Sequence, residues 1–149
     1  VFPYHILQNF SQKVFLAIGF SETDATLATK VLLKADLRGI DSHGIARLSG
    51  YVRLWEAKRL NANPKVEKVY ETPSTATMDG DAGVGLVVAP QAMKVAIEKA
   101  KNCGTGWVSV KNSNHFGIAG YHAMMALEED MIGIALTNAS PIVAPTYSI

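Results

Sequence analysis

The chain has 149 residues, of which 48% are hydrophobic and 18% are charged, and its formal net charge at pH 7 is +1. This composition is typical of a folded globular protein and excludes a disordered chain. The lysines and arginines are scattered rather than clustered, so we expect no nucleic-acid partner. No stretch approaches the roughly 18 uninterrupted apolar residues of a membrane span, so we also expect no membrane insertion.

Two further features concern the compartment. The single cysteine, Cys103, cannot form an internal disulfide, which fits a reducing environment. The first residues lack a basic region followed by an apolar one, which a secretory signal would have. We therefore expect a cytoplasmic protein.

Helical periodicity dominates the first part of the chain. Apolar residues recur at three- and four-residue steps over 6–18 and again over 25–35. Ser21 stands where a helix N-cap is expected, with Asp24 three residues later as the acid of a capping box. Ser42 is a candidate N-cap for a third helix that carries apolar residues from 45 to 55. These three helices are expected to pack on one another.

Strand patterns appear in the second part of the chain. Strands are predicted over 66–70, 75–78, 107–110 and 131–137, with a helix that has Pro90 in its first turn and another over 121–129. Alternation of strands and helices predicts the α/β class. We expect a helical lobe over 1–62 and the first part of an α/β lobe over 63–149.

The segment 79–85 (DGDAGVG) is rich in glycine and precedes a predicted helix. A dinucleotide-binding fingerprint would have a third glycine where Val88 stands, and an acidic residue at the end of the next strand, which is absent. The segment is therefore interpreted as a tight turn that requires positive φ angles, and not as a Rossmann fingerprint.

His43, Arg47 and Tyr51 stand four residues apart, which on a helix would place an imidazole, a guanidinium and a phenol along one side. Such a face suits an organic acid, because an arginine offers two parallel donors to a carboxylate. The start of a helix also favours a neutral imidazole at His43. The plainer alternatives are an exposed histidine, a surface ion pair of Arg47 with Asp41 or Glu56, and a half-buried tyrosine.

His115 lies in a polar run, 112–117 (NSNHFG), directly after an apolar strand. Its neighbours donate or accept hydrogen bonds without carrying a fixed charge, so they can orient the imidazole and select its tautomer. An ordinary histidine in a polar loop is the alternative. The four histidines show no metal-binding spacing, and no second cysteine exists to help them, so no metal site is predicted.

Ser42 and His43 raise the question of a nucleophile and its base. Neighbours in sequence at a helix start are expected to point in different directions, and no nucleophile elbow surrounds Ser42. A helix cap is the simpler role for this serine.

Four runs of residues closely resemble the type 2 malate/L-lactate dehydrogenases, a family that also includes sulfolactate and ureidoglycolate dehydrogenases and some cyclic imino-acid reductases. The runs are 35–47 (ADLRGIDSHGIAR), 112–120 (NSNHFGIAG), 137–141 (TNASP) and 144–146 (APT). The resemblance implies a non-Rossmann fold with a mixed sheet, in which a helical lobe, completed by the C-terminal part of the chain, adjoins a nicotinamide-binding α/β lobe. Family members are longer, so the chain is expected to be their N-terminal portion, inactive by itself.

The resemblance also implies roles for individual residues. His115 matches the catalytic histidine that takes the hydroxyl proton of a 2-hydroxy acid and returns it in the reverse direction. Arg47 matches the residue that holds the substrate carboxylate, and Ser42, His43 and Tyr51 match its neighbours in the substrate pocket. Cofactor contacts are expected from one set of residues: Asn138, Ala139, Ser140, Pro141 and Thr146.

The expected activity is hydride transfer between NAD or NADP and the C2 position of a small 2-hydroxy or 2-oxo acid of the malate or lactate type. A homodimer is the assembly that the resemblance implies. The alternative from another class is a non-catalytic module that binds a small acid or supports assembly, because most cofactor contacts would lie beyond residue 149. A hydrolase that uses Ser42 and His43 is a third, weaker hypothesis.

Overall fold

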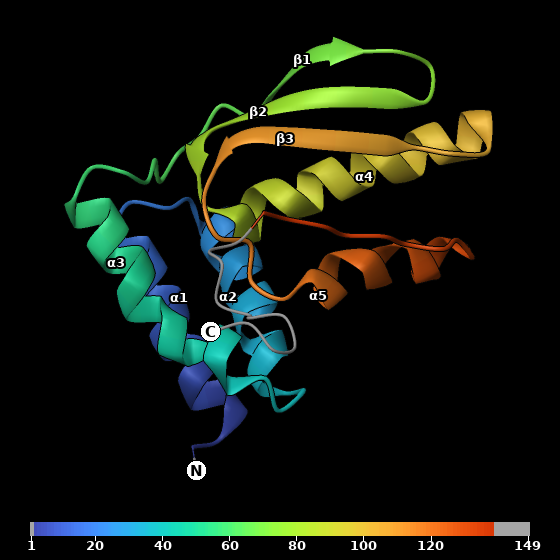
Figure 1. Cartoon of the computed structure of the whole chain (residues 1–149). Helices are drawn as coiled ribbons and strands as arrows, with labels where there is room; N and C mark the ends of the chain where they lie inside the picture. The colour runs from blue at the N-terminus through green and yellow to red at the C-terminus, as the bar shows by residue number, and fades with distance from the viewer. Residues whose placement is uncertain (1, 139–149) are drawn as a thin grey trace, which may run out of the picture.

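The chain folds into a group of helices joined to a small sheet (Figure 1). This computed structural model describes residues 2–138. The elements, in chain order, are α1 (Tyr4–Ala17), α2 (Glu22–Asp36), the 3-10 turns η1 (Asp41–His43) and η2 (Ile45–Arg47), α3 (Leu48–Glu56), β1 (Glu67–Glu71), β2 (Thr75–Gly83), α4 (Gly85–Cys103), β3 (Trp107–Ser113), α5 (Ala119–Met124) and the 3-10 helix η3 (Met125–Glu129).

The first two helices follow the sequence prediction. The Ser21 side chain accepts a hydrogen bond from the Asp24 amide at 3.1 Å, so Ser21 is the N-cap of α2. The buried face of α2 includes Ala28, Val31 and Leu32, and α1 packs against it through Phe15. The predicted packing of α1 on α2 is therefore confirmed.

The third helix begins later than predicted. Residues 41–47 form the short turns η1 and η2, and the backbone of Gly44 between them (φ −90°, ψ −143°) is not helical. Ser42 is therefore not a helix N-cap, and α3 starts only at Leu48. His43, Arg47 and Tyr51 do not share the surface of one helix, so that part of the prediction is wrong.

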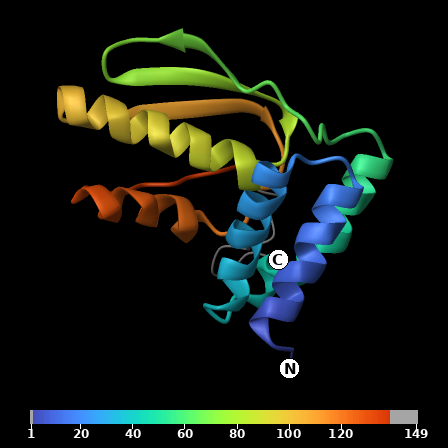
Figure 2. The same cartoon turned by 180° about the vertical axis from the view of Figure 1, so that it is seen from behind.

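The sheet has the order β1-β2-β3 and is mixed. β1 pairs antiparallel with β2, and β2 pairs parallel with β3 in a register that sets Met78 opposite Val110. α4 lies along one face of the sheet, where Ala76 and Met78 are buried (Figure 2). The α/β class with a mixed sheet is confirmed.

One hydrophobic core joins the helices to the sheet. It includes Phe15 from α1, Leu32 from α2 and Tyr51 from α3, together with Leu86 and Val87 at the start of α4. The division into lobes at 62 and 63 stays a prediction, since the core is continuous across it. Within residues 2–138, no helix is both long enough and apolar enough to cross a membrane.

The glycine-rich segment is not a separate turn. β2 continues through Gly83 and α4 begins at Gly85, so Pro90 lies inside α4 rather than in its first turn. Positive φ angles occur at Asp81 (49°) and Ala82 (55°) and not at the glycines of this segment. Gly85 is required for close approach: a Cβ there would lie 2.5 Å from the Asn114 carbonyl oxygen and from the Phe116 Cβ.

The predicted strand over 131–137 is not part of the sheet. The segment is extended, and Ile132, Ile134 and Leu136 are exposed while the residues between them are half-buried. Both views show the red segment running back from η3 toward the end of β3 (Figures 1 and 2). The alternation expected of a strand is present, but no strand of residues 2–138 pairs with it.

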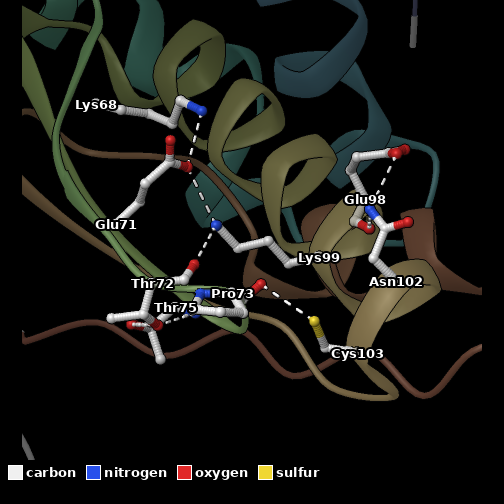
Figure 3. Close-up of polar contacts among 9 residues, drawn as sticks. All are labelled: Lys68, Glu71, Thr72, Pro73, Thr75, Glu98, Lys99, Asn102 and Cys103. Carbon is white, nitrogen blue, oxygen red and sulfur yellow. Dashed lines mark hydrogen bonds and ion pairs between the residues drawn. The ribbon is translucent and has the colours of Figure 1, made fainter.

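A polar cluster fixes the β1–β2 turn to α4 (Figure 3). The Lys99 ammonium donates to the Thr72 carbonyl at 2.6 Å and to the Glu71 carboxylate at 3.1 Å. Lys68 reaches the same Glu71 oxygen at 2.9 Å, and these hydrogen bonds lower the pKa of Glu71. The cluster therefore holds the far end of the sheet on α4.

Replacement of Gly85 by alanine should destabilise the protein. The added methyl group would overlap the backbone of the His115 loop, and such overpacking costs about 1–3 kcal/mol. Urea unfolding of Gly85→Ala measures this loss. Gly120→Ala is the matched control, because a Cβ at Gly120 meets nothing within 4 Å, and its stability should be unchanged or slightly raised. Equal stabilities of the two variants would contradict the assigned contact.

Candidate active site

The segment that carries Ser42, His43 and Arg47 is attached to the end of α2. The Asp36 carboxylate accepts a hydrogen bond from the Ile45 amide at 2.9 Å, next to Gly44. A side chain at Gly44 would overlap that carboxylate, so only glycine permits the contact. The residue types gave no clear signal for this anchor, although Asp36 and Gly44 stand in one of the runs that carry the family resemblance.

Ser42 and His43 are in contact. The Ser42 hydroxyl lies 2.9 Å from Nδ1 of His43, so the two side chains do not point in different directions as expected. The prediction failed because it placed both residues at the start of a regular helix, whereas the η1 turn brings them together. The expectation that a helix start favours a neutral imidazole at His43 loses its basis for the same reason.

Arg47 is held by its own segment and keeps most of its donors available. Its Nε donates to the Ser42 carbonyl at 2.8 Å. Within residues 2–138 it makes no ion pair, so the alternative of a surface pair with Asp41 or Glu56 is absent from that part of the chain. Within the described residues, the two terminal amino groups of the guanidinium therefore keep their donors for another partner.

His115 follows β3 in the predicted polar loop and is half-buried. Its Nδ1 accepts a hydrogen bond from the Gly117 amide at 3.2 Å and lies 2.8 Å from the Tyr51 hydroxyl. The ring centroid of His43 is 5.5 Å away. Burial lowers the pKa of His115, and the charges of Arg47 and His43 lower it further.

Tyr51 is more buried than predicted. Its side chain is only 2% exposed, and its ring lies 6.2 Å from that of Phe15 in the core. Burial raises the pKa of the phenol, although Arg47 acts in the opposite direction. The hydroxyl is therefore a neutral group directed at His115.

Contacts on the far side of the loop fix the position of His115. The Asn114 side-chain amide donates to the Ala82 carbonyl at 2.7 Å, and Nε2 of His122 lies 2.8 Å from the Phe116 carbonyl. His122 is 2% exposed and stacks on the Phe116 ring at 4.9 Å. Sequence reasoning missed His122, because a histidine with no polar neighbours in sequence carries no signal of such a role.

The fold brings all five predicted residues of the substrate side together: Ser42, His43, Arg47, Tyr51 and His115. Of the residues predicted to contact the cofactor, the structure describes only Asn138, which is exposed. Ala139, Ser140, Pro141 and Thr146 lie outside the described residues. Two hollows along α4 are lined by other residues, including Lys99 and Lys101, and none of the five residues lines them. In the part of the chain that is described, no group of His, Cys, Asp or Glu could hold a metal ion.

The sequence matches the malate/L-lactate dehydrogenase family over residues 2–149. The chain belongs to this family. It is 50% identical to a malate dehydrogenase of Pyrococcus abyssi over 147 residues, which are 99% of this chain and 41% of that protein. It is 46% identical to the L-sulfolactate dehydrogenase of Methanocaldococcus jannaschii over 132 residues, 89% of this chain and 38% of that protein.

Solved structures agree with this assignment. The malate dehydrogenase of Pyrococcus horikoshii OT3 superposes with a TM-score of 0.82 at 46% identity, covering 85% of this chain and 36% of that one. The sulfolactate dehydrogenase of Methanocaldococcus jannaschii gives a TM-score of 0.84 at 41% identity, covering 86% and 37%. The chain thus spans about two fifths of the length of the curated relatives it matches.

Buried histidines should make stability depend on pH. Burial lowers the pKa of His122, so between pH 8 and 5.5 the unfolded chain, with a histidine pKa of about 6.5, takes up protons more readily than the folded protein. The free energy of unfolding should fall as the pH is lowered through this range. The same holds for His115.

Urea unfolding of the complete protein at several pH values measures this dependence. His122→Gln should flatten it, because one of the two histidines whose pKa is lowered is removed. His5→Gln, which changes an exposed histidine of α1, should leave it unaltered. An identical pH dependence in His122→Gln and the wild type would show that His122 does not contribute.

Proposed function

We propose that the complete protein is a dehydrogenase that transfers a hydride between NAD or NADP and the C2 position of a small 2-hydroxy or 2-oxo acid. The observation that carries this proposal is the meeting of Arg47 and His115, from distant parts of the chain, around Tyr51. The names of the relatives, which are malate and sulfolactate dehydrogenases, support the substrate class.

Arg47 binds the carboxylate of the acid. Its Nε is already engaged with the Ser42 carbonyl, which fixes the plane of the guanidinium. The remaining terminal amino groups match the two oxygens of a carboxylate in a bidentate pair. His43 and Ser42, linked at 2.9 Å, lie beside this position and complete the substrate side.

His115 transfers the proton of the substrate hydroxyl. Because burial and the nearby Arg47 lower its pKa, the neutral imidazole predominates at neutral pH and serves as the base in hydroxy-acid oxidation. The imidazolium returns the proton to the oxygen at C2 in the reverse direction. A histidine suits both directions, because its pKa lies close to neutrality.

The cofactor supplies the hydride chemistry at the nicotinamide ring. The residues that we assign to it begin at Asn138 and continue through Ala139, Ser140 and Pro141 to Thr146. Asn138 is exposed and follows the segment that runs back toward the end of β3, which fits such a contact. Assembly as a homodimer in the cytoplasm also belongs to this proposal.

The role of Arg47 can be tested by substitution with alanine in the complete protein. Loss of a hydrogen-bonded pair with a charged group costs about 1.5–3 kcal/mol, so kcat/KM for malate or sulfolactate should fall about 10- to 150-fold. Most of the change should appear in KM. Arg53→Ala, on the exposed side of α3, is the control and should retain wild-type kinetics. Unaltered kcat/KM in Arg47→Ala would count against the assignment.

The role of His115 predicts a different pattern. His115→Ala should lower kcat by about 10²- to 10⁴-fold, the usual contribution of a positioned acid or base. Binding of the reduced cofactor, followed by its fluorescence, should remain at the wild-type level. His5→Ala serves as a control for the loss of an imidazole. Turnover near the wild-type rate in His115→Ala would require another proton donor.

A hydrolase remains the second candidate, because the Ser42 hydroxyl contacts Nδ1 of His43. A serine nucleophile needs a base that a third group orients, and no carboxylate hydrogen-bonds to His43 within residues 2–138. Labelling of Ser42 by a serine-directed phosphonate would support this function. A complete protein that oxidises no 2-hydroxy acid with either cofactor would instead favour a non-catalytic acid-binding module.

A further inference from the structure

Nδ1 of His115 has two hydrogen-bonding neighbours of different character. The Gly117 amide, at 3.2 Å, can only donate a hydrogen bond. The Tyr51 hydroxyl, at 2.8 Å, can either donate or accept one. In the neutral resting state, Gly117 therefore favours the tautomer with a lone pair on Nδ1 and the proton on Nε2, and Tyr51 donates to Nδ1.

The proton transfer assigned to His115 requires the opposite arrangement. During reduction of a 2-oxo acid, hydride arrives at C2, the carbonyl π pair moves onto oxygen, and that oxygen takes the proton from Nε2 of the imidazolium. The ring that remains is neutral and carries its proton on Nδ1. In oxidation, the alkoxide pair re-forms the carbonyl as hydride leaves C2, and Nε2 accepts the hydroxyl proton while Nδ1 keeps its own.

Once Nδ1 carries a proton, it donates a hydrogen bond and needs a partner that can accept one, which the Gly117 amide cannot do. Within residues 2–138, the Tyr51 hydroxyl is the group in contact with Nδ1 that can accept this hydrogen bond. The tyrosine is well suited to hold this position, because its ring is buried in the core against Phe15. Burial also raises the pKa of the phenol, so the hydroxyl keeps its own proton during the exchange.

We propose that Tyr51 is a positioning residue for His115, whose hydroxyl reverses from donor to acceptor as Nδ1 gains a proton, so that Nε2 can exchange a proton with the substrate. The catalytic part of this inference rests on the proposed function. The hydrogen-bond reversal itself is a property of the two side chains.

The charged and titratable groups around His115 make this acceptor important. Arg47 from η2 and His43 from η1 both lower the pKa of His115, and His122 of α5 lies beyond the Phe116 ring. No carboxylate contacts the His115 ring within the described part of the chain. The hydrogen bond that Tyr51 accepts from Nδ1–H is then the main stabilisation of the imidazolium.

The test is Tyr51→Phe in the complete protein, since phenylalanine keeps the ring in the core and removes only the hydroxyl. Tyr121→Phe is the matched control, a half-buried tyrosine packed on the same core whose hydroxyl makes no hydrogen bond within residues 2–138. Protein labelled with ¹⁵N-histidine reports the protonation midpoint of His115 and its neutral tautomer by NMR. Steady-state kinetics with malate or sulfolactate give kcat, KM and their pH profiles.

The Tyr51→Phe variant should show a lower protonation midpoint for His115, because phenylalanine cannot accept a hydrogen bond from Nδ1–H of the imidazolium. Its kcat should fall about 10- to 150-fold, the loss expected for one hydrogen bond to a charged group, with KM changed less than about threefold. The acidic limb of the oxidation pH profile should move to lower pH. Tyr121→Phe should resemble the wild type in all of these measurements.

Two results would overturn the inference. A protonation midpoint of His115 in Tyr51→Phe that equals that of the wild type would show that the hydroxyl does not govern Nδ1. A wild-type kcat in Tyr51→Phe would show that the reversal has no part in turnover, while the proposed function would stand. If His115→Ala turns over near the wild-type rate, the proton-transfer role of His115 and the catalytic role of Tyr51 both fail, and the NMR midpoint alone decides whether Tyr51 controls Nδ1.

Discussion

Burial of the first turn of α4 is the interaction on which the arrangement of the site depends. Val84 and Leu86 are fully buried in the core shared with α2 and α3, so the strand end and the helices are held as one body. Gly85, between them, lets the loop after β3 pass directly over this turn. Apolar packing therefore sets where the end of β2 and the start of α4 lie, and the polar contacts of Asn114 and His122 then fix His115 beside them.

The electrostatic character of the site follows from this packing. Arg47, His43 and His115 converge, while the nearby carboxylate of Asp36 is turned toward the Ile45 amide. Within residues 2–138, the Arg47 charge stands near His115 without a compensating carboxylate, which raises the cost of protonating that histidine and favours an anion. Binding of the proposed organic acid would place a negative charge beside Arg47.

Local signals predicted the local structure well. The Ser21 cap, the alternation of elements and the polar loop around His115 were all visible in the sequence, because each depends on residues close together in the chain. The predictions that failed did so because tertiary contacts decide the structure at those residues. Gly44 interrupts the expected third helix to contact Asp36, and Tyr51 is drawn into the core. The convergence of the five site residues needed the family resemblance, since spacing alone assumed a continuous helix.

The hydrogen bond between Tyr51 and His115 joins residues 64 positions apart, across the whole β1-β2-α4-β3 segment. Closing so long a loop costs entropy that only later contacts recover, and topologies with many such contacts fold slowly. The helices that carry Arg47 have mostly local contacts and are expected to form early. If the proposed roles hold, the half of the site that binds the carboxylate would form before the half that transfers the proton, and a protein arrested between these stages would hold an acid without turning it over.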